Sequence, residues 1–285
     1  MGNLSVIIVT WNSKDEITVC VESVINNSND LQPELIIIDN NSADNSFEVI
    51  NRIKYSNLHT YKNENNLGYT KAVNQGIKYS TCENLLLLNP DTILQANTLD
   101  ILNDFLNENQ GYGACAPLLL NPDGTVQHSL RTFPSYWKMF SEFSLLSYIF
   151  PKSKLFGGWK IKYFDYSHDA NVQQPMAAAL MIKKSVLNDV KNMDERFEMF
   201  FNDVDLCKKI IDAGYKIRLL TSAKVIHEHG VSIHKDRIRM IKIWNKDCVR
   251  YFEKHHNNAI LLLWLKINLK ISEILRILYY KLFKS

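Results

Sequence analysis

A run of four leucines that ends in an acidic residue constrains the fold of this chain most. Residues 85–88 are all leucine, and Asn89, Pro90 and Asp91 follow them. A short apolar run bounded by turn formers predicts a strand buried on both faces, as in the middle of a parallel sheet covered by helices. Pro90 has no N–H to donate to a neighbouring strand, so the strand should end there. Because open α/β sheets bind ligands at their carboxyl edge, Asp91 is a candidate site residue; the alternative is that it only caps a following helix.

The first half of the chain repeats this order of apolar strand, polar turn and amphipathic helix. The strand over residues 35–38 ends in Asp39, as the strand over 85–88 ends in Asp91. Strands that alternate with helices predict an α/β fold, with a mostly parallel central sheet flanked by helices and right-handed crossovers. We expect further strands over residues 4–9, 58–61, 114–120, 177–182, 216–220 and 224–226, and helices that carry residues 17–25, 47–53, 70–79, 99–106 and 203–213.

Composition limits the class of protein. A chain of 285 residues with 46% hydrophobic and 22% charged residues should be folded and globular. The net charge of +3 is too small to indicate a nucleic-acid partner. The five cysteines form no C-x-x-C pair, so neither a zinc knuckle nor a disulfide framework is indicated, and a reducing cytoplasm fits. We expect no signal peptide, and no apolar run approaches the ~20 residues of a membrane-spanning helix.

Two more polar residues stand at the ends of predicted elements in the second half. His227 follows the strand over 224–226, and Asp203 begins a helix. The helical period puts Asp203 on the apolar face, pointing inward, and puts Asp205 beside Lys209 on the solvated face. The simpler interpretations are that Asp203 only complements the helix N-terminus and that His227 is a hydrogen-bonded core histidine.

The segment over residues 133–159 is unusually rich in aromatic and large apolar residues. Three interpretations stay open from the sequence alone. It could be a helix that covers the sheet, a flap that binds an acceptor, or a lobe that faces a membrane.

Seven short segments occur in an order and spacing that resemble a known family. Together they resemble the inverting glycosyltransferases of family 2 with the GT-A fold, particularly their rhamnosyltransferase-like branch, over roughly residues 4–255. The matching segments are Val6–Asn12, Ile38–Ser42, Asn65–Tyr69 with Asn74 and Gly76, Leu88–Asp91, Met193–Phe197, Phe201–Cys207 and Val225–His227.

The resemblance implies a pocket for a nucleotide-sugar donor. In such enzymes the acid after the second strand binds the pyrimidine ring, which falls on Asp39, and Thr10 and Trp11 line the base pocket. The other donor-binding positions that the resemblance implies are Asn12, Gly68, Asn74 and Asn89.

The resemblance also implies a divalent metal, Mg²⁺ or Mn²⁺, and a catalytic base. Asn89-Pro90-Asp91 looks like the family's D-x-D motif with only the last acid kept, so Asp91 would hold the metal, with His227 near it. A hard cation neutralises charge on the leaving diphosphate, and a carboxylate takes the proton of the attacking hydroxyl, a role that falls on Asp203. The usual acid before the base is Asn202 here, which puts that acid's role in doubt.

The resemblance divides the chain into a GT-A catalytic domain over residues 1–233 and a C-terminal helical region over 234–285. The nucleotide-binding half covers about 1–125 and the acceptor-binding half about 126–233. Within 259–285 an apolar stripe opposes lysines, which predicts an in-plane helix on an anionic membrane surface. The alternatives are packing on the catalytic domain or pairing with a second copy in a homodimer. The stripe consists of Ile260, Trp264, Ile267, Ile271, Ile274, Leu278 and Leu282.

The expected function is transfer of a sugar, best matched by L-rhamnose from dTDP-L-rhamnose, to a polysaccharide or lipid-linked oligosaccharide. The location would be cytoplasmic or peripheral on the inner face of the cell membrane. The alternatives are a UDP-hexose or UDP-N-acetylhexosamine donor, and a non-catalytic subunit that binds nucleotide sugars. A dinucleotide-dependent oxidoreductase and a sugar nucleotidyltransferase are disfavoured, because no glycine-rich turn follows the first strand.

Overall fold

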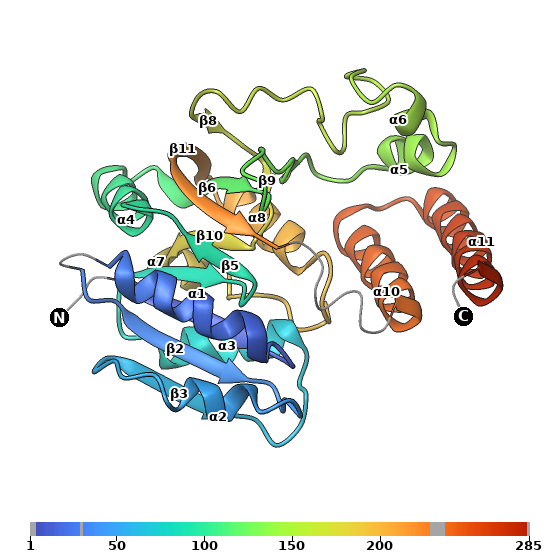
Figure 1. Ribbon diagram of the computed structural model, residues 1–285. Coiled ribbons are helices and arrows are strands. Elements are labelled where there is room, and N and C mark those ends of the chain that lie inside the picture. Colours follow the sequence, from blue (N-terminus) through green and yellow to red (C-terminus); the bar gives the residue numbers. More distant parts are fainter. Residues whose placement is uncertain (1–3, 29–30, 229–236, 284–285) are drawn as a thin grey trace.

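A nine-stranded sheet runs through the computed structural model, which describes residues 4–28, 31–228 and 237–283 (Figure 1). Its strands lie in the order β3-β2-β1-β4-β10-β6-β11-β5, and β8 pairs with β11. β7 (Leu130–Arg131) and β9 (Gln174–Pro175) form a separate pair. The strands of the large sheet are β1 (Leu4–Thr10), β2 (Glu34–Asp39), β3 (Leu58–Lys62), β4 (Asn84–Leu88), β5 (Thr92–Leu94), β6 (Tyr112–Leu120), β8 (Ala170–Asn171), β10 (Ala179–Lys183) and β11 (Lys216–His227).

The predicted mostly parallel sheet is confirmed. The first four strands pair in parallel, and so do β6 and β11. β10 runs antiparallel between β4 and β6, and β5 pairs antiparallel with the end of β11. The carboxyl ends of β1, β2, β4 and β11 therefore open toward the same side of the molecule.

Helices cover both faces of the sheet. For this reason neighbouring residues of each central strand, which point to opposite faces, are both buried. Ile7 of β1 belongs to one apolar core and Ile8 to the other. α3 approaches β1 closely at Gly76, where an added Cβ would lie 2.4 Å from Cγ2 of Ile7. The covering helices are α1 (Lys14–Asn26), α2 (Ser46–Ile50), α3 (Tyr69–Tyr79), α4 (Thr98–Glu108), α7 (Lys184–Asp189) and α8 (Asn202–Asp212).

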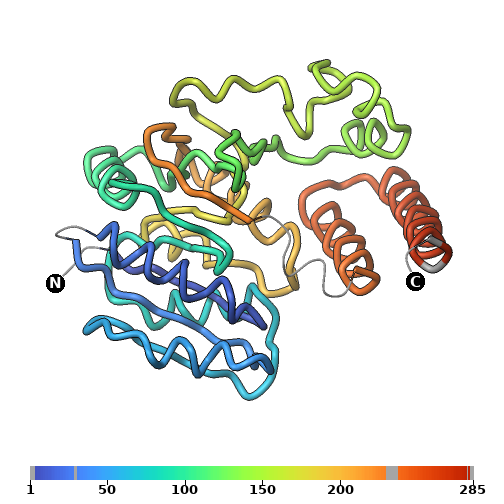
Figure 2. Tube along the Cα trace, viewed as in Figure 1, coloured from blue at the N-terminus to red at the C-terminus, as the bar shows by residue number. Residues whose placement is uncertain are grey.

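A third apolar core lies beside the sheet, between α5 (Tyr136–Phe143), α10 (Arg237–His255) and α11 (Ala259–Phe283). The two C-terminal helices lie side by side, and α5 with the short α6 (Leu146–Ile149) lies next to them (Figures 1 and 2). The segment over 133–159 thus packs on the C-terminal helices, and the interpretation as a helix that covers the sheet is wrong.

Three sequence-based expectations need correction. The strands expected over 216–220 and 224–226 are one strand, β11, with a register shift between Leu220 and Lys224. Asp91 does not cap a helix, because β5 follows it directly. The helix expected to begin at Asp203 begins one residue earlier, at Asn202, and is preceded by Phe201 with a φ of 57°. The predicted domain boundary at 233/234 lies outside the described residues.

Candidate functional site

A pocket lies where the carboxyl ends of β1, β2, β4 and β11 meet. The strand ends and the turns after them provide most of its lining, and α10 closes one side. Five predicted residues line it: Trp11, Gly68, Asn89, Asp91 and His227. Its other polar and charged lining residues are Asn40, Asn66, Tyr69, Glu198 and Arg239.

Thr10 and Asp39 lie directly behind this lining, side by side in the β1–β2 register. Both residues are fully buried, and the residues that follow them, Trp11 and Asn40, reach the pocket. One carboxylate oxygen of Asp39 accepts a hydrogen bond from the backbone N–H of Ser42 at 3.0 Å. Its other oxygen and the Thr10 hydroxyl have no hydrogen-bond partner among the described residues. Buried polar atoms are rarely left unpaired, so these two oxygens fit a ligand with N–H groups, such as a pyrimidine ring.

Asn12 and Asn74 shape the pocket without lining it. Asn12, with a φ of 53°, accepts a hydrogen bond from the Ala43 N–H at 2.8 Å and so holds the loop after β2. The amide of Asn74 bonds the backbone of Met193 and the carboxylate of Glu195, each at 3.0 Å. The structure therefore supports a structural role for both side chains.

Asp91 and His227 come together because β5, which follows Asp91, pairs with the end of β11. Nε2 of His227 lies 3.5 Å from Oδ1 of Asp91, and Nδ1 lies 2.8 Å from Oε1 of Gln127. That amide oxygen accepts a hydrogen bond from Nδ1, so Nε2 is the ring nitrogen turned toward Asp91. A carboxylate and a neutral imidazole nitrogen are both ligands of divalent cations, so this pair would hold one together with phosphate and water. The described part of the chain contains no group of three or more His, Cys, Asp or Glu side chains arranged to hold a metal ion.

Asp203 lies in the first turn of α8 and is partly buried, as the helical period predicted. Its Oδ2 accepts a hydrogen bond from Nε2 of Gln174 at 3.0 Å, and its Oδ1 accepts one from the N–H of Val204 at 2.8 Å. Burial raises the pKa of this carboxyl, and the hydrogen bonds oppose that rise. Tyr69 lines the pocket, and burial together with the carboxylates of Asp203 and Asp91 raises its pKa. Tyr69 thus lies in the electrostatic field of both the proposed base and the proposed metal ligand.

Asn202 holds α8 against α3. Its amide nitrogen donates to the Thr70 hydroxyl at 3.1 Å and to the Met199 carbonyl at 3.0 Å. A carboxylate has no hydrogen to donate, so the amide suits this buried position where the family usually has an acid.

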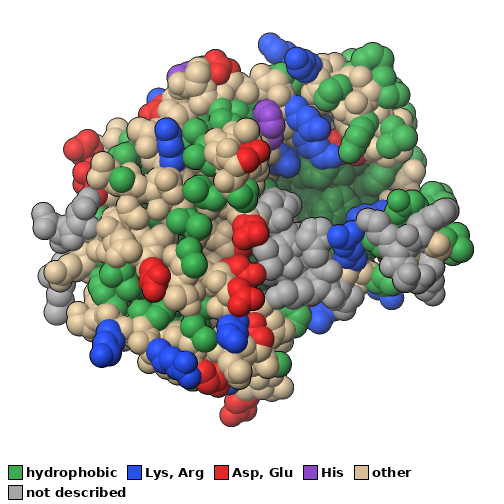
Figure 3. Space-filling model, viewed as in Figure 1, with side chains coloured by type: hydrophobic (Ala, Val, Ile, Leu, Met, Phe, Trp, Pro, Cys, Tyr) green, Lys and Arg blue, Asp and Glu red, His purple; other side chains and the backbone are tan. Residues whose placement is uncertain are grey.

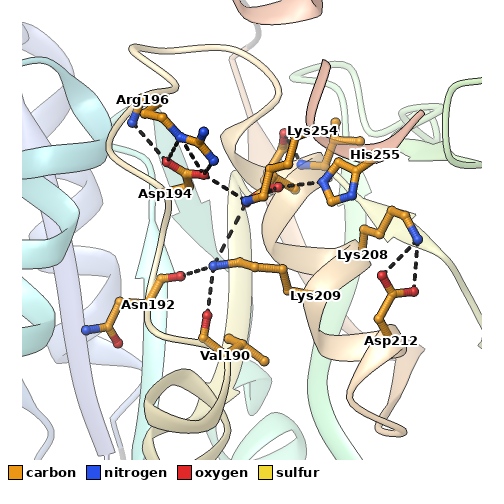
Figure 4. Close-up of polar contacts among 12 residues, drawn as sticks. Val190, Asn192, Asp194, Arg196, Lys208, Lys209, Asp212, Lys254 and His255 are labelled. Carbon is orange, nitrogen blue, oxygen red and sulfur yellow. Dashed lines mark hydrogen bonds and ion pairs between the residues drawn. The ribbon is translucent and has the colours of Figure 1, made fainter. Parts of the chain in front are cut away.

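Asp205 does not lie on a solvated face, and that prediction is wrong. It is fully buried and bonds Lys254 at 2.7 Å and His255 at 2.7 Å, both from α10. Lys254 also bonds Asp194 at 2.8 Å, while Lys209 donates to backbone carbonyls of the same segment (Figure 4). This polar cluster ties α10 to α8, the helix that carries Asp203.

The contribution of α10 to the pocket was missed from the sequence. Arg239, Met240 and Ile243 line it. Asp247 is fully buried and accepts hydrogen bonds at 3.1 Å from three consecutive backbone N–H groups, those of residues 198–200. No sequence motif marks the residues of α10 that reach the pocket. The basic composition after residue 224 is the one sequence feature that sets this region apart.

Comparisons with known proteins show the family of this chain. The sequence profile of Glycosyl transferase family 2 matches residues 5–170, more than half of the chain. N-acetylglucosaminyl-diphospho-decaprenol L-rhamnosyltransferase of Mycobacterium tuberculosis is 24% identical over 234 residues, which are 78% of this chain and 75% of that protein. Low-salt glycan biosynthesis hexosyltransferase Agl10 of Haloferax volcanii is 24% identical over 236 residues, 81% of this chain and 69% of that protein.

Two solved structures have the same fold. TarS of S. aureus, residues 1–349, matches all of this chain and 76% of its own with a TM-score of 0.59 and 16% identity. GalNAc-T7, solved with UDP, GalNAc and Mn²⁺, matches 87% of this chain and 47% of its own with a TM-score of 0.63 and 14% identity. At these identities the likeness shows the fold alone, that of GT-A transferases. Because the family profile covers most of the chain, this protein belongs to glycosyl transferase family 2 and is a glycosyltransferase.

Proposed function

We propose that the protein transfers a sugar, with inversion, from a nucleotide sugar held in the pocket to a saccharide hydroxyl. One observation carries the proposal. Asp91, His227 and Tyr69 line the pocket, and Asp203, outside the lining, accepts a hydrogen bond from the backbone of Ala177, the neighbour of the lining residue Met176. A diphosphate site with a proton acceptor close to it is what a single displacement at an anomeric carbon requires.

In this mechanism Asp203 takes the proton of the acceptor hydroxyl as its oxygen bonds to the anomeric carbon. The bond from that carbon to the diphosphate oxygen breaks at the same time, and the diphosphate leaves with the electron pair. Asp91 and His227 would hold Mg²⁺ or Mn²⁺, which neutralises charge on the leaving group. Gln174 keeps the Asp203 carboxylate oriented and favours its ionised form.

For the donor we propose dTDP-L-rhamnose, with Asp39 and Thr10 at the thymine. Support comes from the named activity of the mycobacterial relative and from the two unpaired buried oxygens. A UDP-hexose or UDP-N-acetylhexosamine is the alternative donor, since UDP is bound in one TarS structure. A non-catalytic binding subunit is the other alternative, because Asn202 replaces an acid.

For the acceptor we propose a lipid-linked oligosaccharide at the inner face of the cell membrane. The mycobacterial relative is named for an acceptor on diphospho-decaprenol. A hollow floored by hydrophobic side chains lies between the α5–α6 region and the C-terminal helices (Figure 3), and its apolar character suits part of a lipid carrier. No described helix is long and apolar enough to cross a membrane.

A panel of donors tests the proposed function. The protein is incubated with dTDP-L-rhamnose and with UDP- and GDP-sugars, each with Mn²⁺ and with EDTA, and release of nucleoside diphosphate is measured. We expect metal-dependent release that is fastest from dTDP-L-rhamnose. Faster release from a UDP-sugar would replace the donor assignment, and absence of release from every donor, with binding retained, would favour the non-catalytic subunit.

A further inference from the structure

We propose that α11 and the lobe over residues 137–156, which contains α6, form one surface that docks on an anionic lipid bilayer. We refer to this surface as the docking face. Among the described residues, its side chains include the most exposed large apolar ones: Ile260 is 81% exposed, Tyr148 74% and Leu282 71%. Exposed apolar groups on this scale mark an interaction site in a folded protein.

α11 has one face turned to the protein and one turned away from it. Leu265 and Leu269 are buried in the core shared with α10. Ile267, Leu275 and Leu278 project from the other face, and each is about half exposed or more. Packing against the protein therefore accounts for only one apolar face of a 25-residue helix.

A chain of aromatic rings joins the lobe to α11. Phe150 contacts Phe156 with ring centroids 5.7 Å apart, and Phe156 lies 6.1 Å from Trp137. Trp137 stacks on Phe140 at 5.4 Å, and Phe140 lies 6.2 Å from Trp264 of α11. Figure 3 shows hydrophobic side chains over this lobe and again along the edge that α11 forms. The two parts are thus one continuous surface, rich in the aromatic residues that favour membrane interfaces.

The charge of the docking face favours an anionic bilayer over an uncharged apolar partner. The lobe contains Lys138, Lys152, Lys154 and one acid, Glu142, which pairs at 2.5 Å with Lys160. Lys160 and Lys162 follow the lobe directly in the chain. Lys152, Lys154 and Lys162 are exposed, and Nζ of Lys162 lies 5.6 Å from the ring centroid of Tyr148. Exposed lysines beside exposed aromatic and aliphatic groups match anionic headgroups above acyl chains.

α11 carries net positive charge as well, from Lys266, Lys270, Arg276 and Lys281. Glu273 is the only acid in residues 259–285. Lys270 pairs with it at 2.8 Å, and Lys266 pairs with Glu253 of α10 at 2.7 Å. Both the lobe and α11 therefore carry net positive charge, while α11 supplies most of the exposed apolar area.

Vesicle sedimentation of the full chain tests the docking face independently of any donor or acceptor. Vesicles of phosphatidylcholine alone are compared with vesicles that also contain phosphatidylglycerol, at low and high salt. The variants are Ile149→Glu in the lobe and Leu275→Glu in α11, with Val19→Glu, at an exposed position of α1, as the matched control. Circular dichroism and nucleotide binding verify that each variant is folded.

We expect the wild-type protein and the control to bind vesicles that contain phosphatidylglycerol, with partial release at high salt because charge attraction is screened. Each docking-face variant should lower the partition coefficient at least about tenfold, which corresponds to about 1.4 kcal/mol. If either variant bound vesicles as strongly as the wild-type protein does, the proposal that the two parts form a single continuous docking face would be wrong. Equal binding to phosphatidylcholine alone would overturn the anionic partner. A dimer that Leu275→Glu dissociates, in a protein that ignores vesicles, would show that a second copy covers the face.

Discussion

At the residue scale, the pocket is built from polar side chains whose partners are only partly provided by the protein. Asp39 and Thr10 keep buried oxygens without a partner among the described residues. Nε2 of His227 and Oδ1 of Asp91 lie 3.5 Å apart. Buried polar oxygens without a partner are costly, which supports the proposed ligand-binding role of Thr10 and Asp39.

Asp91→Ala should weaken metal-dependent nucleotide binding and leave the fold intact, because Asp91 follows β4 and lines the pocket, outside the apolar cores. Calorimetric titration with dTDP and Mn²⁺ should show at least about a tenfold loss of affinity. Asp123→Ala, in the exposed turn after β6, is the matched control. Unchanged affinity in Asp91→Ala would remove this residue from the metal site.

Gln174→Leu should move the acid limb of the rate profile to higher pH. The hydrogen bond from Gln174 lowers the pKa of Asp203, whereas burial raises it, so loss of the bond raises the pKa further. Asp203 acts as a base only when ionised, so a higher pH is needed for the same rate. Gln173→Leu, at the exposed neighbouring position, is the control. A profile that does not move would show that Gln174 has only a packing role.

At the element scale, the sequence predicts the parallel half of the sheet well and the second half less well. The runs that become β1, β2 and β4 are apolar and end in polar turns, so local pattern is sufficient. β5, β7 and β9 are only two or three residues long and carry no such pattern.

Long-range partners explain the other failures. Asp205 looks solvated because its nearest charged neighbour in the helix is Lys209, yet its partners Lys254 and His255 lie 49 and 50 residues away. The residues of α10 that line the pocket are also far in the sequence from the strand ends that form it. Local sequence pattern therefore could not predict their contribution. Asp91, Asp203 and His227 were identifiable because each stands at the end of an element; the partners that orient them, such as Gln127 and Gln174, carry no pattern.

Asp205→Ala should strongly destabilise the protein, because it leaves the partly buried Lys254 and His255 without their shared, fully buried carboxylate, and only Lys254 keeps another partner, Asp194. Breaking a buried ion pair from one side costs about 3–5 kcal/mol. Asp212→Ala on the same helix removes an exposed pair with Lys208 and should cost less than about 0.5 kcal/mol. Urea unfolding of both variants measures the difference. Equal losses of stability would show that the cluster does not hold α10 on α8.

At the scale of the whole molecule, the C-terminal helices serve two purposes. α10 closes the donor pocket, and α11 covers the third core on its inner face while its outer face remains exposed. A GT-A domain that carries such a face can work at a surface without any segment that crosses it. Under the proposed function, this arrangement would bring the pocket close to an acceptor held in a membrane.

Leu265→Ala and Leu263→Ala should separate the two faces of α11. Leu265 is fully buried, so its truncation should lower the free energy of unfolding by about 2–5 kcal/mol. Leu263 is 60% exposed, and its truncation should change stability by less than about 0.5 kcal/mol while weakening vesicle binding. Urea unfolding and vesicle sedimentation are measured on both. A loss of stability in Leu263→Ala would mean that the outer face is also packed.

The central claim is that Asp203 is the base of a glycosyl transfer, and single-turnover kinetics of Asp203→Asn with the preferred donor test it most directly. Asparagine keeps the shape and cannot accept the proton, so the rate should fall about a hundredfold to ten-thousandfold, with donor affinity unchanged. A variant that retains more than about a tenth of the wild-type rate would contradict the claim, because another group would then have to act as the base.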